Sequence, residues 1–112
     1  MMDQNTAKGG VFVDFFGKKA ATPRALALLS YRSETPILPL FCYPTDKGTY
    51  RIVYGPEIQL KKSDSRDNDI LSWTYHYEQF IENIIRENPA PWMCGHRRWK
   101  TRPPEEKGTR IY

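Results

Sequence analysis

A stripe of apolar residues in the second half of the chain sets the narrowest limits on its fold. Its members recur at steps of three and four residues: Ile70, Trp73, Tyr77, Phe80, Ile81 and Ile84. This spacing is that of one face of an α-helix, which the sequence predicts from Asp67 or Asn68 to Glu87. Asn88-Pro89 ends the helix, because a proline disfavours helical backbone in the residue before it. A helix with one apolar face must bury that face against other elements.

Two shorter elements are predicted in the first half of the chain. Residues 11–13 form a short apolar run typical of a strand, and residues 15–19 form a turn that contains two phenylalanines. Thr22-Pro23 is typical of a helix start, because a hydroxyl cap is followed by proline at the first helical position. We expect this helix to continue through Leu29 and to be buried, since it is apolar nearly all round.

A β-hairpin is predicted between the two helices. The run at residues 36–43 is continuously apolar and bounded by prolines, and its length favours a buried strand. Residues 46–48 indicate a turn, and residues 50–54 alternate in character as a second strand does. The chain is therefore assigned to the α/β class, with room for one small domain. Because the first helix and the proline-bounded strand each need partners on more than one side, we expect neighbouring strands upstream.

Basic residues are concentrated at the C-terminal end. The formal net charge is +4 and the isoelectric point about 9.1, and residues 96–112 contain six Lys or Arg against two Glu, which accounts for the whole excess. Within residues 92–103 the basic side chains alternate with tryptophans. Guanidinium groups bind phosphates, and indole rings suit a stacked base or a membrane interface. Three interpretations remain open: a lipid-phosphate surface, a nucleic-acid-binding module, and a solvated tail whose tryptophans pack on the core.

The sequence contains none of the common catalytic or metal-binding motifs. Its two histidines, His76 and His96, and its two cysteines, Cys42 and Cys94, lack the spacing of a zinc site, and no phosphate-binding glycine loop or serine elbow occurs. Cys42 lies in an apolar run and is expected to be buried. No stretch approaches the roughly 20 apolar residues of a membrane-spanning helix, and residues 1–10 lack the apolar core of a signal peptide.

Several blocks of the sequence, in order, resemble the bacterial lipid A biosynthesis acyltransferases, which transfer lauroyl or myristoyl chains. Residues 96–103, HRRWKTRP, resemble the family's C-terminal signature, and Asn88-Pro89 followed by Trp92 resembles the lead-in to it. Five further blocks are similar upstream: Asp3-Gln4 and residues 10–17, 20–23, 36–39 and 50–52. The resemblance covers nearly the whole chain.

The resemblance implies a fold and a reaction. The fold would be the C-terminal part of a glycerolipid-acyltransferase-like α/β fold, with residues 1–112 as the C-terminal portion of a single acyltransferase domain. The reaction would be O-acyl transfer from acyl carrier protein or acyl-CoA to a hydroxyl of a lipid A precursor or a related glycolipid. It would need no cofactor. Its place would be an anionic membrane surface, the cytoplasmic face of the bacterial inner membrane, with no nucleic acid among its partners.

The resemblance also implies which residues face the substrates. Those near the mouth of the active site would be Asp3 and Gln4. Those that shape the acceptor or acyl pocket would be Phe15, Phe16, Gly17 and Thr22. Those that meet lipid phosphates or the acidic carrier protein would be His96, Arg97, Arg98, Lys100 and Arg102.

The chain departs from the family in the catalytic pair. In the family a His and a carboxylate five positions later provide the base: the carboxylate orients the imidazole, which deprotonates the acceptor hydroxyl. Here the residue five positions after His76 is Ile81, and the residue five positions after His96 is Thr101. We therefore expect the pair to lie upstream of Asp3, and we expect this polypeptide to be a fragment that is inactive alone.

Overall fold

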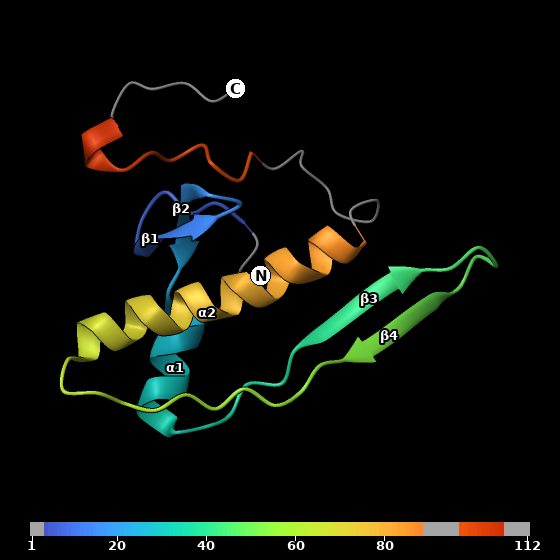
Figure 1. Ribbon diagram of the computed structural model, residues 1–112, viewed down its shortest axis with the longest axis horizontal. Helices are drawn as coiled ribbons and strands as arrows, with labels where there is room; N and C mark the ends of the chain where they lie inside the picture. Colours follow the sequence, from blue (N-terminus) through green and yellow to red (C-terminus); the bar gives the residue numbers. More distant parts are fainter. Residues whose placement is uncertain (1–3, 89–96, 107–112) are drawn as a thin grey trace.

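The computed structural model describes residues 4–88 and 97–106, which form two β-hairpins, two α-helices and a short 3₁₀ helix (Figure 1). The elements follow one another as β1 (Gly10–Phe15), β2 (Lys18–Pro23), α1 (Ala25–Ser33), β3 (Leu40–Pro44), β4 (Tyr50–Tyr54), α2 (Arg66–Glu87) and η2 (Pro104–Glu106). Strand β1 pairs with β2 and β3 pairs with β4, both antiparallel, in two separate sheets. The predicted α/β class is therefore confirmed.

Helix α2 forms close to the predicted position and ends at Glu87 as predicted. Its first turn is held by side chains on both sides of the start. Ser65 caps the helix, because its hydroxyl accepts a hydrogen bond from the Asn68 N–H (3.4 Å). The Asp69 carboxylate accepts hydrogen bonds from the N–H and the hydroxyl of Ser63 (2.7 and 2.6 Å). These hydrogen bonds fix residues 63–65 of the preceding loop to the first turn of α2.

The β1–β2 hairpin closes through a two-residue turn and packs on α2. Phe16 and Gly17 both have positive φ angles, 52° and 78°, as a type I′ hairpin turn requires. This conformation is unfavourable for a bulky residue, and the Phe16 N–H is held by donating a hydrogen bond to the Glu82 carboxylate of α2. Phe15 packs with Ile85 in a small core beneath the hairpin. The predicted strand and turn are therefore confirmed.

Thr22-Pro23 ends a strand, so the predicted helix start at this position is wrong. Thr22 lies opposite Val11 and Pro23 opposite Gly10 in the hairpin. Helix α1 begins only at Ala25, without a side-chain cap. Pairing with β1 overrides the local capping preference here, and a proline is tolerated because each strand of a two-stranded sheet is an edge strand.

Helix α1 is buried on one side only. Its inner side contributes Ala27 to the main core, whose other buried members are Ile58, Ile70, Trp73 and Tyr77. On the outer side Leu29 is 65% exposed. The predicted all-round burial of this helix is therefore wrong, because no described element covers its outer side.

Strands β3 and β4 form the predicted hairpin, which together with its turn (residues 40–54) we call the arm. Figure 1 shows the arm reaching away from the rest of the molecule. Cys42 on β3 is exposed and its thiol is free, and Leu40 and Ile52 are exposed as well. The predictions of a buried strand and a buried Cys42 are therefore wrong. An apolar run indicates burial only where another element covers it, and no described element covers this side of the arm.

Candidate functional site

The segment at residues 97–106 contains most of the basic residues expected at the site, and it lies beside the β1–β2 hairpin (Figure 1). The Arg98 guanidinium donates hydrogen bonds to the Ala21 carbonyl oxygen (2.8 Å) and to the Thr22 hydroxyl oxygen (2.6 Å). Its Nη2 also forms an ion pair with Oε2 of Glu78 on α2 (3.2 Å), and both side chains of this pair are fully buried. Arg98 therefore ties β2 to α2.

Aromatic rings pack around the same guanidinium. The Trp99 indole N–H donates to the Phe15 carbonyl oxygen (3.2 Å), and the two ring centroids are 5.8 Å apart. The Phe16 ring meets the Phe15 ring edge-on at 4.9 Å, and the guanidinium carbon of Arg98 lies 5.2 Å from the Phe15 ring centroid. The interpretation in which a tail tryptophan packs on the core is thus confirmed for Trp99. Trp92 lies outside the described residues.

Further hydrogen bonds join the N-terminal residues to the same segment. The Asn5 side-chain amide donates to the Thr101 hydroxyl (3.0 Å) and its oxygen accepts from the Thr101 N–H (3.1 Å). Arg102 donates to the Lys19 carbonyl oxygen (2.8 Å) and forms an ion pair with Glu106. The N-terminal residues, the hairpin and the basic segment therefore form one unit, which we call the seat: residues 5, 15–22 and 98–102.

Several site residues predicted from the sequence meet at the seat. Those in direct contact around Arg98 are Phe15 and Thr22, with Phe16 against Phe15. Those exposed at its margins are Gln4, Gly17, Arg97 and Lys100. Arg98 and Arg102 bind protein atoms, and Asp3 and His96 lie outside the described residues. Substrate contact at each of these residues stays a prediction.

Two glutamates of α2, Glu78 and Glu82, contact the seat although they were not among the predicted site residues. Glu78 and Glu82 are both buried: Glu78 pairs with Arg98, and Glu82 accepts from the Phe16 N–H. Arg86 lies over the Phe16 ring at 4.7 Å and 3.7 Å from Glu82. Their spacing in the sequence could have indicated this position. Glu78, Glu82 and the apolar Ile85 recur at steps of four and three residues, so they share a second face of α2, and this face packs against the hairpin.

The seat combines aromatic rings with exposed cations. Within residues 4–88 and 97–106, no three His, Cys, Asp or Glu side chains are grouped to hold a metal ion. His76 is exposed on α2 with its ring 5.5 Å from that of Phe80. What the seat presents to a ligand is the half-buried rings of Phe16 and Trp99 together with the exposed cations Arg97 and Lys100. Such a surface can attract an anionic group.

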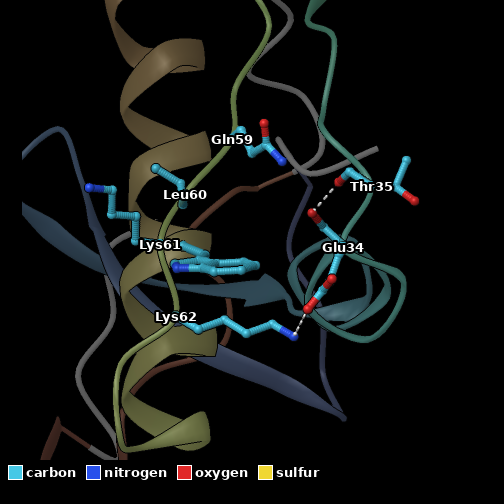
Figure 2. A pocket seen from close by; sticks show the side chains of 8 residues that line it. Glu34, Thr35, Gln59, Leu60, Lys61 and Lys62 are labelled. Atoms are coloured by element: carbon cyan, nitrogen blue, oxygen red, sulfur yellow. Dashed lines mark hydrogen bonds and ion pairs between the residues drawn. The ribbon is translucent and has the colours of Figure 1, made fainter.

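A polar hollow of about 450 Å³ lies on another part of the molecule, between the end of α1, residues 59–62 and Trp73 (Figure 2). Figure 2 shows the Lys62 side chain extended toward Glu34, with which it forms an ion pair at 3.0 Å. The same ammonium group lies 4.6 Å from the Tyr31 ring centroid. The charge of Lys62 is thus already paired within the protein, and the hollow does not extend the seat.

An apolar groove of about 270 Å³ lies at the root of the arm, between α1, β3 and α2. Its lining includes Leu26, Leu40, Phe80 and Ile81. Tyr77 is the lining residue with an ionisable side chain. The groove joins the main core, through Ile58 and Tyr77, to the exposed side of the arm, through Leu40.

Burial makes the Tyr77 phenol harder to deprotonate. Burial raises the pKa of the Tyr77 phenol above its ordinary value of 10.0, although a hydrogen bond with Ser30 offsets part of the effect. Above that ordinary value the unfolded chain loses the phenol proton while the folded chain keeps it, so stability falls as pH rises. We expect the free energy of unfolding to fall more steeply with alkaline pH in the wild type than in Tyr77→Phe. Urea unfolding at stepped pH measures both slopes, and equal slopes would contradict the expectation.

No curated protein matches the chain at a significant level. A model of the family described as bacterial lipid A biosynthesis acyltransferase matches residues 1–101. That span includes both hairpins, both α-helices and the basic segment as far as Thr101, out of 112 residues in all. The resemblance noted in the sequence is therefore confirmed, and the chain belongs to the bacterial lipid A biosynthesis acyltransferase family.

Proposed function

We propose that the chain takes part in O-acyl transfer from acyl carrier protein or acyl-CoA to a hydroxyl of a lipid A precursor or a related glycolipid. The observation that carries this proposal is the family match over residues 1–101. An acyl donor and a lipid acceptor follow from the family in general terms. We propose more specifically that the donor is acyl carrier protein or acyl-CoA and that the acceptor is a lipid A precursor or a related glycolipid.

The seat supplies the anion-binding part of this function. Arg98 and Arg102 are occupied by the Ala21 and Lys19 carbonyl oxygens and by carboxylates, so they hold the basic segment in place. Arg97 and Lys100 are exposed beside them. Charges held on a rigid support bind an anion at a smaller entropic cost than charges on a free tail. We assign these two side chains to the phosphates of the acceptor or to the acidic carrier protein.

The base for this reaction would come from a polypeptide segment other than this chain. Acyl transfer to a hydroxyl is accelerated by a base placed within hydrogen-bond reach of that hydroxyl. The residues five positions after His76 and His96 are Ile81 and Thr101, so neither histidine has the carboxylate that the family resemblance implies. We propose that the 112 residues fold as the C-terminal portion of a glycerolipid-acyltransferase-like domain and that alone they do not turn over substrate.

The place of action that we propose is an anionic membrane surface, the cytoplasmic face of the bacterial inner membrane. Two observations support it. The family's acceptor is a lipid, and the chain carries a net charge of +4, which favours association with acidic lipids. In the part of the chain that the structure describes, no helix is both long and apolar enough to cross a bilayer.

Binding of a lipid A precursor in detergent micelles tests this function. We expect the chain to bind the precursor and the Arg97→Ala, Lys100→Ala double variant to bind it about thirtyfold more weakly, since each surface cation near an anionic headgroup contributes about 1 kcal/mol. The matched control is Arg24→Ala with Arg32→Ala, which removes the same charge from the exposed surface of α1. Equal losses in the two double variants, or no binding by the wild type, would contradict the proposal.

The same preparation tests the expected inactivity. The chain is incubated with the precursor and with acyl carrier protein that carries a fatty acyl group, and mass spectrometry follows the acyl ester. We expect no ester from the chain alone, because the His–carboxylate pair is missing from its sequence. Clear turnover would end that part of the proposal while leaving the binding result intact.

No observation favours the nucleic-acid-binding alternative. Two of the arginines that would contact the phosphate backbone, Arg98 and Arg102, contact protein atoms. Trp99 packs on Phe15, so it is not free to stack on a base. The family match supports acyl transfer.

A further inference from the structure

The turn of the first hairpin has a backbone conformation that its sequence does not favour. A two-residue turn of this type is usually Asn-Gly or Asp-Gly, because both positions need a positive φ angle. Here the first position is Phe16, with φ of 52°, and the second is Gly17. A bulky residue keeps such a conformation only where the surrounding contacts hold it, and residues of this kind are concentrated at functional sites. The contacts that hold Phe16 are therefore a place to look for function.

Those contacts come from the last turns of α2. The Phe16 N–H donates a hydrogen bond to the Glu82 carboxylate. The guanidinium carbon of Arg86 lies 4.7 Å from the centroid of the Phe16 ring. Arg86 follows Glu82 by one helical turn, and its Nε lies 3.7 Å from Oε2 of Glu82. Each of the three residues thus contacts the other two, and we call this set the clamp: Phe16, Glu82 and Arg86.

The clamp fixes the direction of the Arg86 guanidinium without using its full capacity to bind. The Arg86 side chain is 59% exposed. Its ion pair with Glu82 is long and engages Nε, while Oε1 of Glu82 accepts from the Phe16 N–H. The two terminal nitrogens of the guanidinium take part in neither contact of the clamp. They are donors held in a set orientation at the surface.

Stabilisation of the fold accounts poorly for this arrangement. An ion pair as exposed as that of Arg86 contributes little to stability. An asparagine at position 16 would close the turn without the strain that Phe16 carries. What an asparagine could not supply is a flat aromatic face, on which a guanidinium stacks. The strained Phe16 is explained if the orientation of Arg86 is what matters.

The chemistry of the clamp suits a phosphate group. A planar guanidinium whose terminal N–H groups point outward binds two oxygens of a phosphate at once. Lys18, which follows the turn directly, is exposed and adds positive charge near it. Ring contacts join the clamp to the rest of the seat, since Phe16 lies 4.9 Å from Phe15, and Phe15 lies 5.8 Å from Trp99.

The clamp and the exposed cations of the seat belong to different elements. Figure 1 shows the β1–β2 hairpin between α2, which carries Arg86, and residues 97–106, which carry Arg97 and Lys100. A ligand at the turn would therefore meet positive charge from two elements. A glycolipid whose phosphates are set apart on its sugars fits this distribution of charge.

We propose that Arg86 binds a phosphate group of the lipid acceptor and that Phe16 and Glu82 are positioning residues for its guanidinium. The inference rests on the proposed function, because that function supplies the phosphorylated acceptor. It adds a phosphate-binding residue on α2, separate from Arg97 and Lys100.

The test compares the lipid A precursor in detergent micelles with the same precursor after a phosphatase has removed its phosphates. We expect Arg86→Ala to bind the phosphorylated precursor about fivefold more weakly than the wild type, the effect of one surface cation. On the dephosphorylated precursor the two should bind equally. The matched control is Arg66→Ala, which removes an exposed arginine at the other end of α2, about 30 Å away. It should bind as the wild type does.

Two further variants test the positioning role. Phe16→Leu keeps an apolar side chain without an aromatic face, so it should lose part of the binding. Combined with Arg86→Ala, it should cause no loss beyond that of Arg86→Ala alone, because the ring acts through the guanidinium. Arg86→Lys restores the charge without the planar fork and should lie between the wild type and Arg86→Ala. It also carries the test if Arg86→Ala does not keep the circular dichroism of the wild type.

Four outcomes would overturn the proposal. Equal binding of the phosphorylated precursor by Arg86→Ala and the wild type would exclude Arg86. Equal losses on both forms of the precursor would show that Arg86 supports the seat without meeting a phosphate. A loss seen only in binding to acyl carrier protein would assign Arg86 to the donor. Additive losses for Phe16→Leu and Arg86→Ala would contradict the positioning role.

The same assay separates this inference from the proposed function. The proposed function depends on binding by the wild type and on the loss in the Arg97→Ala, Lys100→Ala double variant. If both are found while Arg86→Ala binds as the wild type does, only the role of Arg86 fails. If the wild type does not bind the precursor, the proposed function fails and the role of Arg86 fails with it.

Discussion

Arg98→Ala should lower the free energy of unfolding by about 3–5 kcal/mol, which is the usual cost of removing one partner from a buried ion pair. The substitution takes away the cation that faces the fully buried Glu78 carboxylate at 3.2 Å. It also removes the donors to the Ala21 carbonyl and the Thr22 hydroxyl. Because domains of this size are stable by only about 5–15 kcal/mol, the variant should be close to unfolding in dilute urea. Urea unfolding followed by circular dichroism measures the loss.

The neighbouring Arg97→Ala is the control, since Arg97 is exposed and its loss should change stability by no more than about 0.5 kcal/mol. A double variant, Glu78→Leu with Arg98→Met, separates the charge effect from packing. Replacing both charges by apolar groups of similar volume should recover much of the stability that the single variant loses. If Arg98→Ala and Arg97→Ala were equally stable, the buried pair would have no role in holding β2 to α2.

Phe15→Ala is expected to cost a similar amount, about 3–5 kcal/mol, because it opens a cavity in a close-packed core. Phe15 is 0% exposed. Its ring contacts the Phe16 and Trp99 rings and the Arg98 guanidinium. Removal of the ring would therefore weaken the packing of the β1–β2 turn, of residues 97–106 and of the Arg98 guanidinium at the same time. Thermal and urea unfolding report the stability, and the near-ultraviolet circular dichroism reports the change around Trp99.

Leu29→Ala is the matched control for this prediction, because it also truncates a large apolar side chain but at a position that is 65% exposed. It should cost less than about 0.5 kcal/mol. Phe15→Leu should lie between the two, since leucine fills part of the space. A stability loss for Phe15→Ala no larger than that for Leu29→Ala would mean that the hairpin core contributes little to the fold.

The sequence could predict those elements whose pattern is local. The stripe from Ile70 to Ile84 was sufficient to place α2, because an apolar repeat at steps of three and four residues is typical of a helix and not of a strand. The arm followed from the turn at residues 46–48 and the alternation after it. Thr22-Pro23 was misleading, because strand pairing with Gly10 and Val11 is a tertiary interaction that local capping preferences do not include.

The sequence singled out several residues that the structure brings together, but it did not predict how they are arranged. The basic segment and the Phe15-Phe16 pair were singled out, and the structure places them against each other. The sequence gives no sign that Arg98 is buried while its neighbour Arg97 is exposed. That difference depends on Glu78, which is 20 residues away along the chain and was not among the predicted site residues. Burial of the pair is a property of the assembled elements.

The pairing of distant segments also constrains how the protein is made. Trp99 closes over Phe15 from 84 positions further along the chain, and Arg98 reaches Ala21 across 77. During synthesis the first hairpin therefore leaves the ribosome long before the residues that cover it. Until then Phe15 has only part of its final surroundings, and contacts of such long range form slowly. Completion of this core is thus a late step of folding, and a nascent chain released before Trp99 would keep an unfinished first hairpin.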